Sequence, residues 1–419
     1  MAPSLPRWRG GGDAIAAQGG IIGATSGRAQ PATPADRRTL KTHRAGAEYA
    51  GTLTSYAVTT PVRVSSDGAF LTHHLHHAHH PSRTKRDAST ADHELHYSLD
   101  LDGEEHQVTL RPNTQFVAPH AVVERVRGGQ VGGDWGEVIG GRPSCHYHGY
   151  VKNHTTSTAA LSTCNGLTGF VRTDHEEYLI EPVQDHTPAH PGAPHPHLVY
   201  KRSALPTPES HTCSSDTYER AIHARSMWEA EQEKAETSEA RRRRRRRKRS
   251  VSLERNVEVT VVADKKMVDY YSNEDLTTYI LTVMNMVSSV FHDASIGNAV
   301  NIYVVRIILL EDDQHEALEI SHNADDTLRS FCQWQQMINP GNETHPHHHD
   351  VAVLLTRYNI CSRVSDWCAT LGVSEIAGMC QPLRSCNVNE DTGLQISYTI
   401  AHELGHNFGM NHDGPQNGM

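Results

Sequence analysis

The sequence predicts two folded regions, a β-rich region in the N-terminal half and an α/β region after residue 250 with a mostly parallel twisted sheet flanked by helices. Short runs between residues 94 and 117 alternate apolar and polar side chains, as half-buried strands do. After residue 250, strand and helix patterns alternate, at residues 257–262, 275–291, 300–310, 325–338 and 351–355. Such alternation is typical of a parallel sheet covered by helices.

Length and composition exclude several classes of protein. A chain of 419 residues exceeds what one hydrophobic core usually organises, so we expect more than one domain. No apolar stretch approaches the roughly 18 to 20 residues that span a bilayer, which argues against a membrane span. The net charge of -10 argues against a nucleic-acid-binding polycation.

Composition changes along the chain predict four segments. Residues 1–45 are of low complexity and are expected to be disordered, and residues 46–184 form the β-rich domain. Residues 185–249 are expected to be a linker because they are rich in Pro, His and Ser and end in a basic run. Residues 250–419 form the α/β domain. The histidine-rich stretch at residues 73–80 is interpreted as a solvated loop, with metal binding as the alternative.

The basic run at residues 241–249 has two possible functions. Arg246 to Arg249 match Arg-x-Lys-Arg, which a proprotein convertase would cut before Ser250, and a similar match at residues 83–86 suggests an earlier cut. The alternative is a nuclear-localisation or polyanion-binding run. The position of the run, where composition changes sharply, favours cleavage.

Cysteines and glycosylation sequons indicate secretion. The eight cysteines form two groups of odd number, so each group holds a free thiol, a metal-binding thiolate or a cysteine without its partner. Cys145 and Cys164 bracket a segment of turns and strands and form the natural pair, which leaves Cys213 alone. Asn153 and Asn342 begin Asn-x-Thr sequons. No apolar signal-peptide core is visible near the N-terminus.

The segment at residues 399–414 predicts a metal site. In a helix, His402 and His406 project from one side, one turn apart, where a single zinc ion can bind both. Gly409 permits the positive φ that ends a helix, so His412 can return as a third ligand. The opposite side of this helix is apolar and predicted to be buried, at Ile396, Ile400, Leu404 and Phe408.

Three protein ligands define a catalytic zinc site, because structural sites close all four positions. Glu403 follows the first ligand, and its carboxylate can accept a proton from zinc-bound water and pass it to a leaving amine. The alternative is a helix with two surface histidines. The glycine and the third histidine favour the catalytic interpretation.

The motif from His402 to Asp413 resembles a metzincin of the adamalysin type. Further similarities, at residues 159–164, 177–182, 257–264, 330–334 and 384–393, make the chain resemble the ADAMTS proteases (a disintegrin and metalloproteinase with thrombospondin motifs). The resemblance implies a β-rich propeptide followed by a metzincin-type catalytic domain. It also implies disulfides joining Cys145 to Cys164, Cys332 to Cys386 and Cys361 to Cys368.

The resemblance further implies a latency thiol and structural calcium. Cys213 would fill zinc's open position until the propeptide leaves, although Ser214 stands where the family often has glycine. Calcium would bind Glu258 and Asp350 in one site. A second site would use Glu390 and three backbones, those of Ile360, Cys368 and Thr370.

The resemblance implies a secreted zymogen of a zinc metalloendopeptidase that cleaves extracellular-matrix proteins with Glu403 as general base. The chain ends seven residues after His412, so we expect the lower subdomain of a metzincin to be missing and activity to be low. The alternative function is an inactive fragment that acts as a metal-binding or inhibitory propeptide module. A nuclear protein is a third interpretation, but it does not account for the zinc motif.

Overall fold

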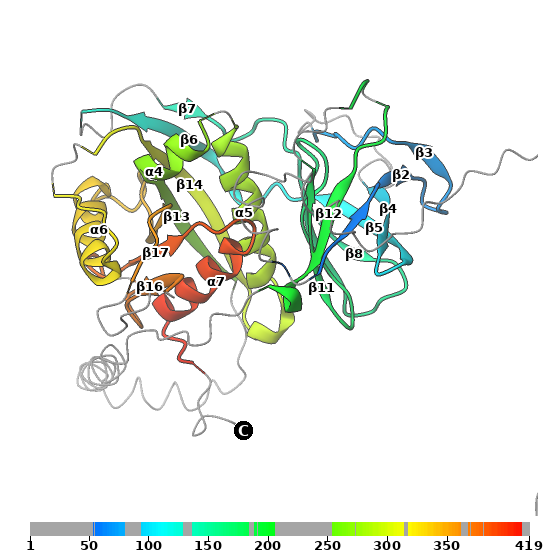
Figure 1. The fold of residues 1–419 in the computed structure, drawn as a ribbon. Helices are drawn as coiled ribbons and strands as arrows, with labels where there is room; N and C mark the ends of the chain where they lie inside the picture. Colours follow the sequence, from blue (N-terminus) through cyan, green and yellow to red (C-terminus); the bar gives the residue numbers. More distant parts are fainter. Residues whose placement is uncertain are drawn as a thin grey trace, which may run out of the picture.

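The computed structural model describes most of the chain outside its N-terminus and the segment that precedes residue 254 (Figure 1). The described residues are 53, 55–79, 94–128, 136–183, 188–190, 192–205, 254–272, 274–313, 317–361, 368, 370–379 and 381–412. Outside them lie several predicted features: residues 1–45, the basic run at 241–249, Cys213, Ser250 and Asp413.

The β-rich region forms a ten-stranded antiparallel sheet in the order β1-β12-β11-β10-β9-β8-β5-β4-β2-β3. Its strands are β1 (Ala57–Thr59), β2 (Val62–Val64), β3 (Phe70–Thr72), β4 (Leu95–Leu101), β5 (Glu104–Pro112), β8 (His146–Val151), β9 (Thr158–Ser162), β10 (Thr168–Arg172), β11 (Glu177–Pro182) and β12 (His197–Lys201). Alternation along β4 and β5 places Tyr97, Leu99 and Val108 in one core, so the predicted β-rich region is confirmed.

The predicted linker is partly wrong. Residues 197–201 form β12, which pairs with both β1 and β11 and is buried for most of its length. The 3-10 turn η3 (Arg202–Ala204) follows it. A five-residue strand between prolines is too short to show a period of two, which is why composition suggested a linker.

The histidine-rich segment is a loop, as predicted, with His74 and His76 exposed, but it is only partly solvated. Leu75 is buried in the sheet core, and the Nδ1 of His77 forms a hydrogen bond with the Tyr147 hydroxyl at 2.7 Å. The Nδ1 of His76 donates to the carbonyl oxygen of Cys164 at 2.8 Å. These contacts fix the segment against the sheet, and sequence polarity alone did not predict them.

A second, seven-stranded sheet has the order β16-β17-β15-β13-β14-β6-β7. Neighbouring strands are parallel except for the two outermost pairs, β16 with β17 and β6 with β7, which are antiparallel. The mostly parallel sheet is therefore confirmed. Its strands are β6 (Val117–Val126), β7 (Glu137–Val138), β13 (Arg255–Ala263), β14 (Val300–Leu310), β15 (Val351–Thr356), β16 (Gly372–Ser374) and β17 (Cys386–Glu390).

Helices cover both faces of this second sheet. Side chains alternate along each buried strand, so Val261 packs in the core with helix α5 (Leu276–Phe291), whereas Val262 packs with helix α6 (Ala324–Ile338). Both helices have side-chain N-caps, Asp275 for α5 and Asn323 for α6. Figure 1 shows α5 between the two sheets and α6 on the far side. The short helices α4 (Lys265–Tyr270) and η4 (Ala294–Ile296) complete the connections.

The position of β6 was not predicted. This strand belongs in sequence to the β-rich region, yet it pairs in parallel with β14 and extends the second sheet. Figure 1 shows β6 and β7 lying over the α/β region, away from the other early strands. The amino-acid pattern of β6 indicates a strand but carries no information about which sheet receives it.

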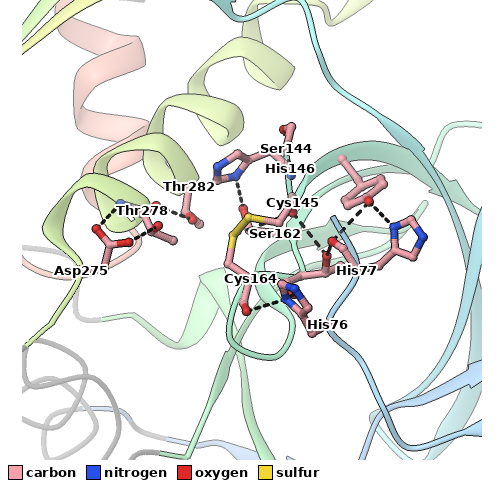
Figure 2. The surroundings of a disulfide bond; sticks show 12 residues. His76, His77, Ser144, Cys145, His146, Ser162, Cys164, Asp275, Thr278 and Thr282 are labelled. Carbon is pink, nitrogen blue, oxygen red and sulfur yellow. Dashed lines mark hydrogen bonds between the residues drawn. A yellow bond between two sulfur atoms is a disulfide. The ribbon is translucent and has the colours of Figure 1, made fainter. Parts of the chain in front are cut away.

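Three disulfides join the same cysteines that the family resemblance pairs. Cys145–Cys164 links β8 to the turn after β9, and Figure 2 shows its surroundings. Cys332–Cys386 fixes α6 to β17, and Cys361–Cys368 closes a short loop after β15. Each crosslink reduces the entropy of the unfolded chain.

Buried histidines should make the fold sensitive to acid. His146 is fully buried, and this burial lowers its pKa from 6.5 to about 3. The unfolded chain binds this proton and the folded chain does not, so the stability is present above pH 6.5 and is lost as the pH falls. We predict that between pH 7 and 5 the chain loses up to about 2 kcal/mol more unfolding free energy than a His146→Asn variant.

Urea unfolding followed by tryptophan fluorescence at each pH measures this difference. Burial also raises the pKa of Asp264 to about 6, which changes stability with pH in the opposite direction. This effect is the same in the unsubstituted chain and in the variant, so it does not alter their difference. Identical pH dependence of the two chains would contradict the assignment of His146.

Candidate metal centre

Helix α7 (Ile396–Asn407) carries the predicted metal ligands. Its apolar side packs in the main core, because Ile396, Ile400 and Leu404 are fully buried, as the sequence predicts. Phe408 follows the helix and lies 5.7 Å, centroid to centroid, from Phe291 of α5. The buried side therefore fixes the rotation of α7 about its axis.

A glycine reverses the chain after α7. Gly409 has φ +91°, in the left-handed region that other residues rarely adopt. Its amide donates to the carbonyl oxygen of His406 at 2.8 Å, and the Met410 amide donates to that of Gly405 at 2.9 Å. These two bonds form a Schellman motif, which satisfies the terminal carbonyls of the helix. The predicted turn at Gly409 is confirmed, and it brings His412 back towards the helix.

Asn407 fixes the end of α7 to the sheet, a role that the sequence pattern did not indicate. Its buried side chain donates to the carbonyl oxygens of Glu375 and Cys386, both at 3.2 Å, and accepts from the Asn387 amide at 2.9 Å. The Ala377 amide donates to the carbonyl oxygen of His406 at 2.8 Å. An asparagine within a helix gives no sequence signal for such a role, because its partners lie far away in the chain.

Three imidazole nitrogens converge at the end of α7. The Nε2 of His412 lies 3.0 Å from the Nε2 of His402 and 3.0 Å from that of His406. The Nδ1 of His406 donates to the carbonyl oxygen of Met410 at 2.8 Å, so its Nε2 carries a free lone pair. Burial lowers the pKa of His406 and favours this neutral form. His402 and His412 are exposed, so solvent reaches the site.

These residues fit a zinc ion. Four ligands in a tetrahedron at about 2.0–2.1 Å place neighbouring nitrogens roughly 3.3 Å apart, close to the separations found here. Among the described residues, the three histidines form one of two groups whose donor atoms could hold a metal. The other group contains Cys145 and Cys164, whose sulfurs form a disulfide and offer no thiolate.

Glu403 directly follows His402 on α7 and is almost completely buried. Burial raises its pKa to about 7, and a hydrogen bond from the Ser374 hydroxyl acts in the opposite direction. Gly372 also makes room for the carboxylate, since a Cβ there would lie 2.7 Å from its Oε1. A carboxylate with a pKa near neutrality can both accept and return a proton. Ser374 and Gly372 of β16 were not identified from the sequence.

The predicted calcium residues lie close together in pairs. An Asp350 carboxylate oxygen accepts from the Glu258 amide at 2.9 Å, and Glu258 lies 3.5 Å from the ring of His348. Glu390 accepts from the Ile360 amide at 3.0 Å, and burial raises its pKa to about 7. Cys368 is exposed and Thr370 is buried. The calcium sites stay predictions.

The two sequon asparagines lie on the surface. Asn153 is exposed in the turn between β8 and β9 with φ +68°, a conformation that asparagine tolerates. Asn342 is exposed in the segment after α6, where its side chain accepts from Thr344. Both positions are accessible to glycosylation.

Two family models match the chain. Residues 57–152 match the reprolysin family propeptide, and residues 255–418 match the reprolysin (M12B) family zinc metalloprotease. The second match contains the three converging histidines and Glu403. The chain belongs to the ADAMTS family of reprolysin-type metalloproteases.

Similar proteins carry the family name in full, a disintegrin and metalloproteinase with thrombospondin motifs. The chain is 44% identical to ADAMTS 12 of Mus musculus. The alignment covers 87% of this chain and 23% of that protein. It is 43% identical to number 7 of Homo sapiens over 85% of the chain and 21% of that protein. It is 42% identical to human number 6 over 88% of the chain and 34% of that protein. The chain thus spans between 21% and 34% of these ADAMTS relatives.

Among the residues that the structure describes, no helix is long and apolar enough to cross a membrane.

Replacing Gly409 should weaken metal binding. A Gly409→Ala change forces a side chain into the left-handed region at a cost of about 1–2 kcal/mol, which displaces His412. We predict a zinc dissociation constant about 10-fold higher, measured by competition with a chromogenic chelator. The matched control is Gly341→Ala, because a Cβ there meets no atom within 4 Å. Equal zinc affinity in both variants would show that the turn does not position His412.

Proposed function

We propose that this ADAMTS chain is the zymogen of a secreted zinc metalloendopeptidase with a metzincin-type catalytic domain. The observation that carries the proposal is the convergence of three imidazole Nε2 atoms at the end of a helix that also carries the buried Glu403 carboxylate. His402, His406 and His412 would hold the ion, with one coordination position left for water or substrate. Extracellular-matrix proteins are the proposed substrate class.

The residues of the site divide the chemistry between them. A bound zinc ion would polarise the scissile carbonyl and lower the pKa of water. Glu403 would remove a proton from the attacking water and deliver it to the leaving amine. Ser374 would hold the carboxylate in place through its hydroxyl.

Strand β16 is proposed to bind the substrate backbone. It stands at the end of the sheet order and contains Gly372 and Ser374, both next to Glu403. An extended peptide can add to such an edge strand through main-chain hydrogen bonds. This would place a scissile bond close to the three histidines.

Latency is proposed to come from the propeptide, which extends through β12. Cys213 would occupy the open position of the zinc ion, and a proprotein convertase would cut after Arg249 to leave Ser250 as the new N-terminus. Residues 206–249 would connect the propeptide, which includes β12 and η3, to the catalytic domain at residues 250–419. Glycans at Asn153 and Asn342, and calcium at Glu258 with Asp350 and at Glu390, are further proposals for the secreted protein.

Substituting Glu403 should separate metal binding from hydrolysis. We predict that, in chains from which the propeptide has been cut and removed, Glu403→Gln keeps one zinc ion per chain but lowers cleavage of a quenched fluorescent peptide by at least about 100-fold, because no base accepts the proton of water. His406→Ala should lose both zinc and cleavage. Elemental analysis and the fluorescence assay, with and without a chelator, measure the two properties separately.

Two results would contradict the proposed hydrolysis. Cleavage that survives in Glu403→Gln would assign the base to another group. Zinc binding without chelator-sensitive cleavage, in the unsubstituted chain from which the propeptide has been cut and removed, would favour the alternative, an inactive metal-binding fragment.

A further inference from the structure

The propeptide contributes a strand to the catalytic sheet. Strand β6 pairs in parallel with β14, with Val122 opposite Arg306 and Val126 opposite Leu310. At one end of this ladder, the Val304 amide donates a hydrogen bond to the carbonyl oxygen of Phe116 at 2.8 Å. At the other end, the Glu311 amide donates to the carbonyl oxygen of Val126 at 3.0 Å. One edge of β14 is therefore satisfied by the propeptide rather than by the catalytic domain.

A buried ion pair makes this pairing specific. The Arg306 guanidinium donates to both carboxylate oxygens of Glu124, at 2.9 and 2.7 Å. Only 4% of the Arg306 side chain and 8% of the Glu124 side chain are exposed. Removing one member of such a pair leaves an unpaired buried charge, which shifts an equilibrium by roughly 100-fold or more. Arg125 lies 3.1 Å from Glu311 at the exposed end of the strand, where an ion pair contributes little.

The two regions also share one hydrophobic core. The cluster that contains Ile280 and Val283 of α5 also includes propeptide side chains. These propeptide residues are Leu53, Phe116, Val123, Ala160, Phe170, Leu179, Leu198 and Tyr200. Apolar surface buried in this way stabilises the contact without any covalent connection.

Polar contacts on α5 complete the interface. The side chain of Asn285 accepts from Asn113 at 2.9 Å and donates to the Tyr147 carbonyl oxygen at 3.2 Å. Arg172 donates to Asp293 at 2.9 Å just beyond the end of the helix. None of these contacts involves residues 206–253, through which the backbone joins the two regions.

We propose that the β14 edge is a docking surface that retains the propeptide as a separate, non-covalently bound chain after the connection is cut. Strand β6 is the occupant of this edge, and Glu124 is its specificity residue. Cutting the chain is then necessary but not sufficient for release. This proposal goes beyond the proposed hydrolysis and needs neither zinc nor activity, so the two can fail independently.

The test replaces residues 241–249 of the full chain with the recognition sequence of a site-specific protease and cuts the purified protein. We expect the two fragments to elute together on size exclusion at physiological salt. Hydrogen exchange at the amides of residues 306–310 should remain as slow as in the uncut chain. Separation of the fragments, or fast exchange at these amides, would overturn the proposal.

A pair of variants tests the role of Glu124. Glu124→Ala should raise the dissociation constant of the cut complex at least about 100-fold. Glu137→Ala on β7 is the matched control, because its ion pair with Arg142 is exposed and should leave the constant unchanged. Equal dissociation constants of the two variants would overturn the assignment of Glu124. If a variant folds poorly, hydrogen exchange in the cut, unsubstituted chain still tests whether the propeptide stays bound.

Discussion

The metal centre depends on how the last turn of α7 is fixed. Amides of Ala377, Gly409 and Met410 bond the terminal carbonyls of the helix, and the Asn407 side chain joins the helix to Glu375 and Cys386. These bonds fix His406 in place and return the chain so that His412 meets it. The proposed ligand set is thus preorganised by backbone hydrogen bonds, which also satisfy the terminal carbonyls of the helix.

The seven-stranded sheet also includes two strands from the propeptide region, β6 and β7. Strand β6 covers one edge of the sheet at β14, whereas the opposite edge, at β16, lies next to Glu403. The propeptide therefore binds the side of the sheet that lies farthest, in strand order, from the proposed catalytic residue Glu403. In the proposed zymogen, the binding of the propeptide and the access of a substrate would therefore depend on different edges of the sheet.

Much of this could be predicted from the sequence because it is local. The order of strands and helices after residue 250, the buried side of α7 and the turn at Gly409 all follow from periodicity or from the conformational freedom of glycine. The rest depends on contacts between distant residues. The β6–β14 pairing, the Glu403–Ser374 bond and the position of Asn407 join residues whose proximity no local pattern encodes, and β12 was too short to show one.

The most direct test of the account is X-ray absorption at the zinc edge of the full chain loaded with one equivalent of zinc. Three imidazole ligands at about 2.0–2.1 Å are predicted, because the Nε2 atoms of His402, His406 and His412 already converge. A spectrum that requires fewer than three imidazoles would contradict the account, since the α7 turn would then not assemble the site.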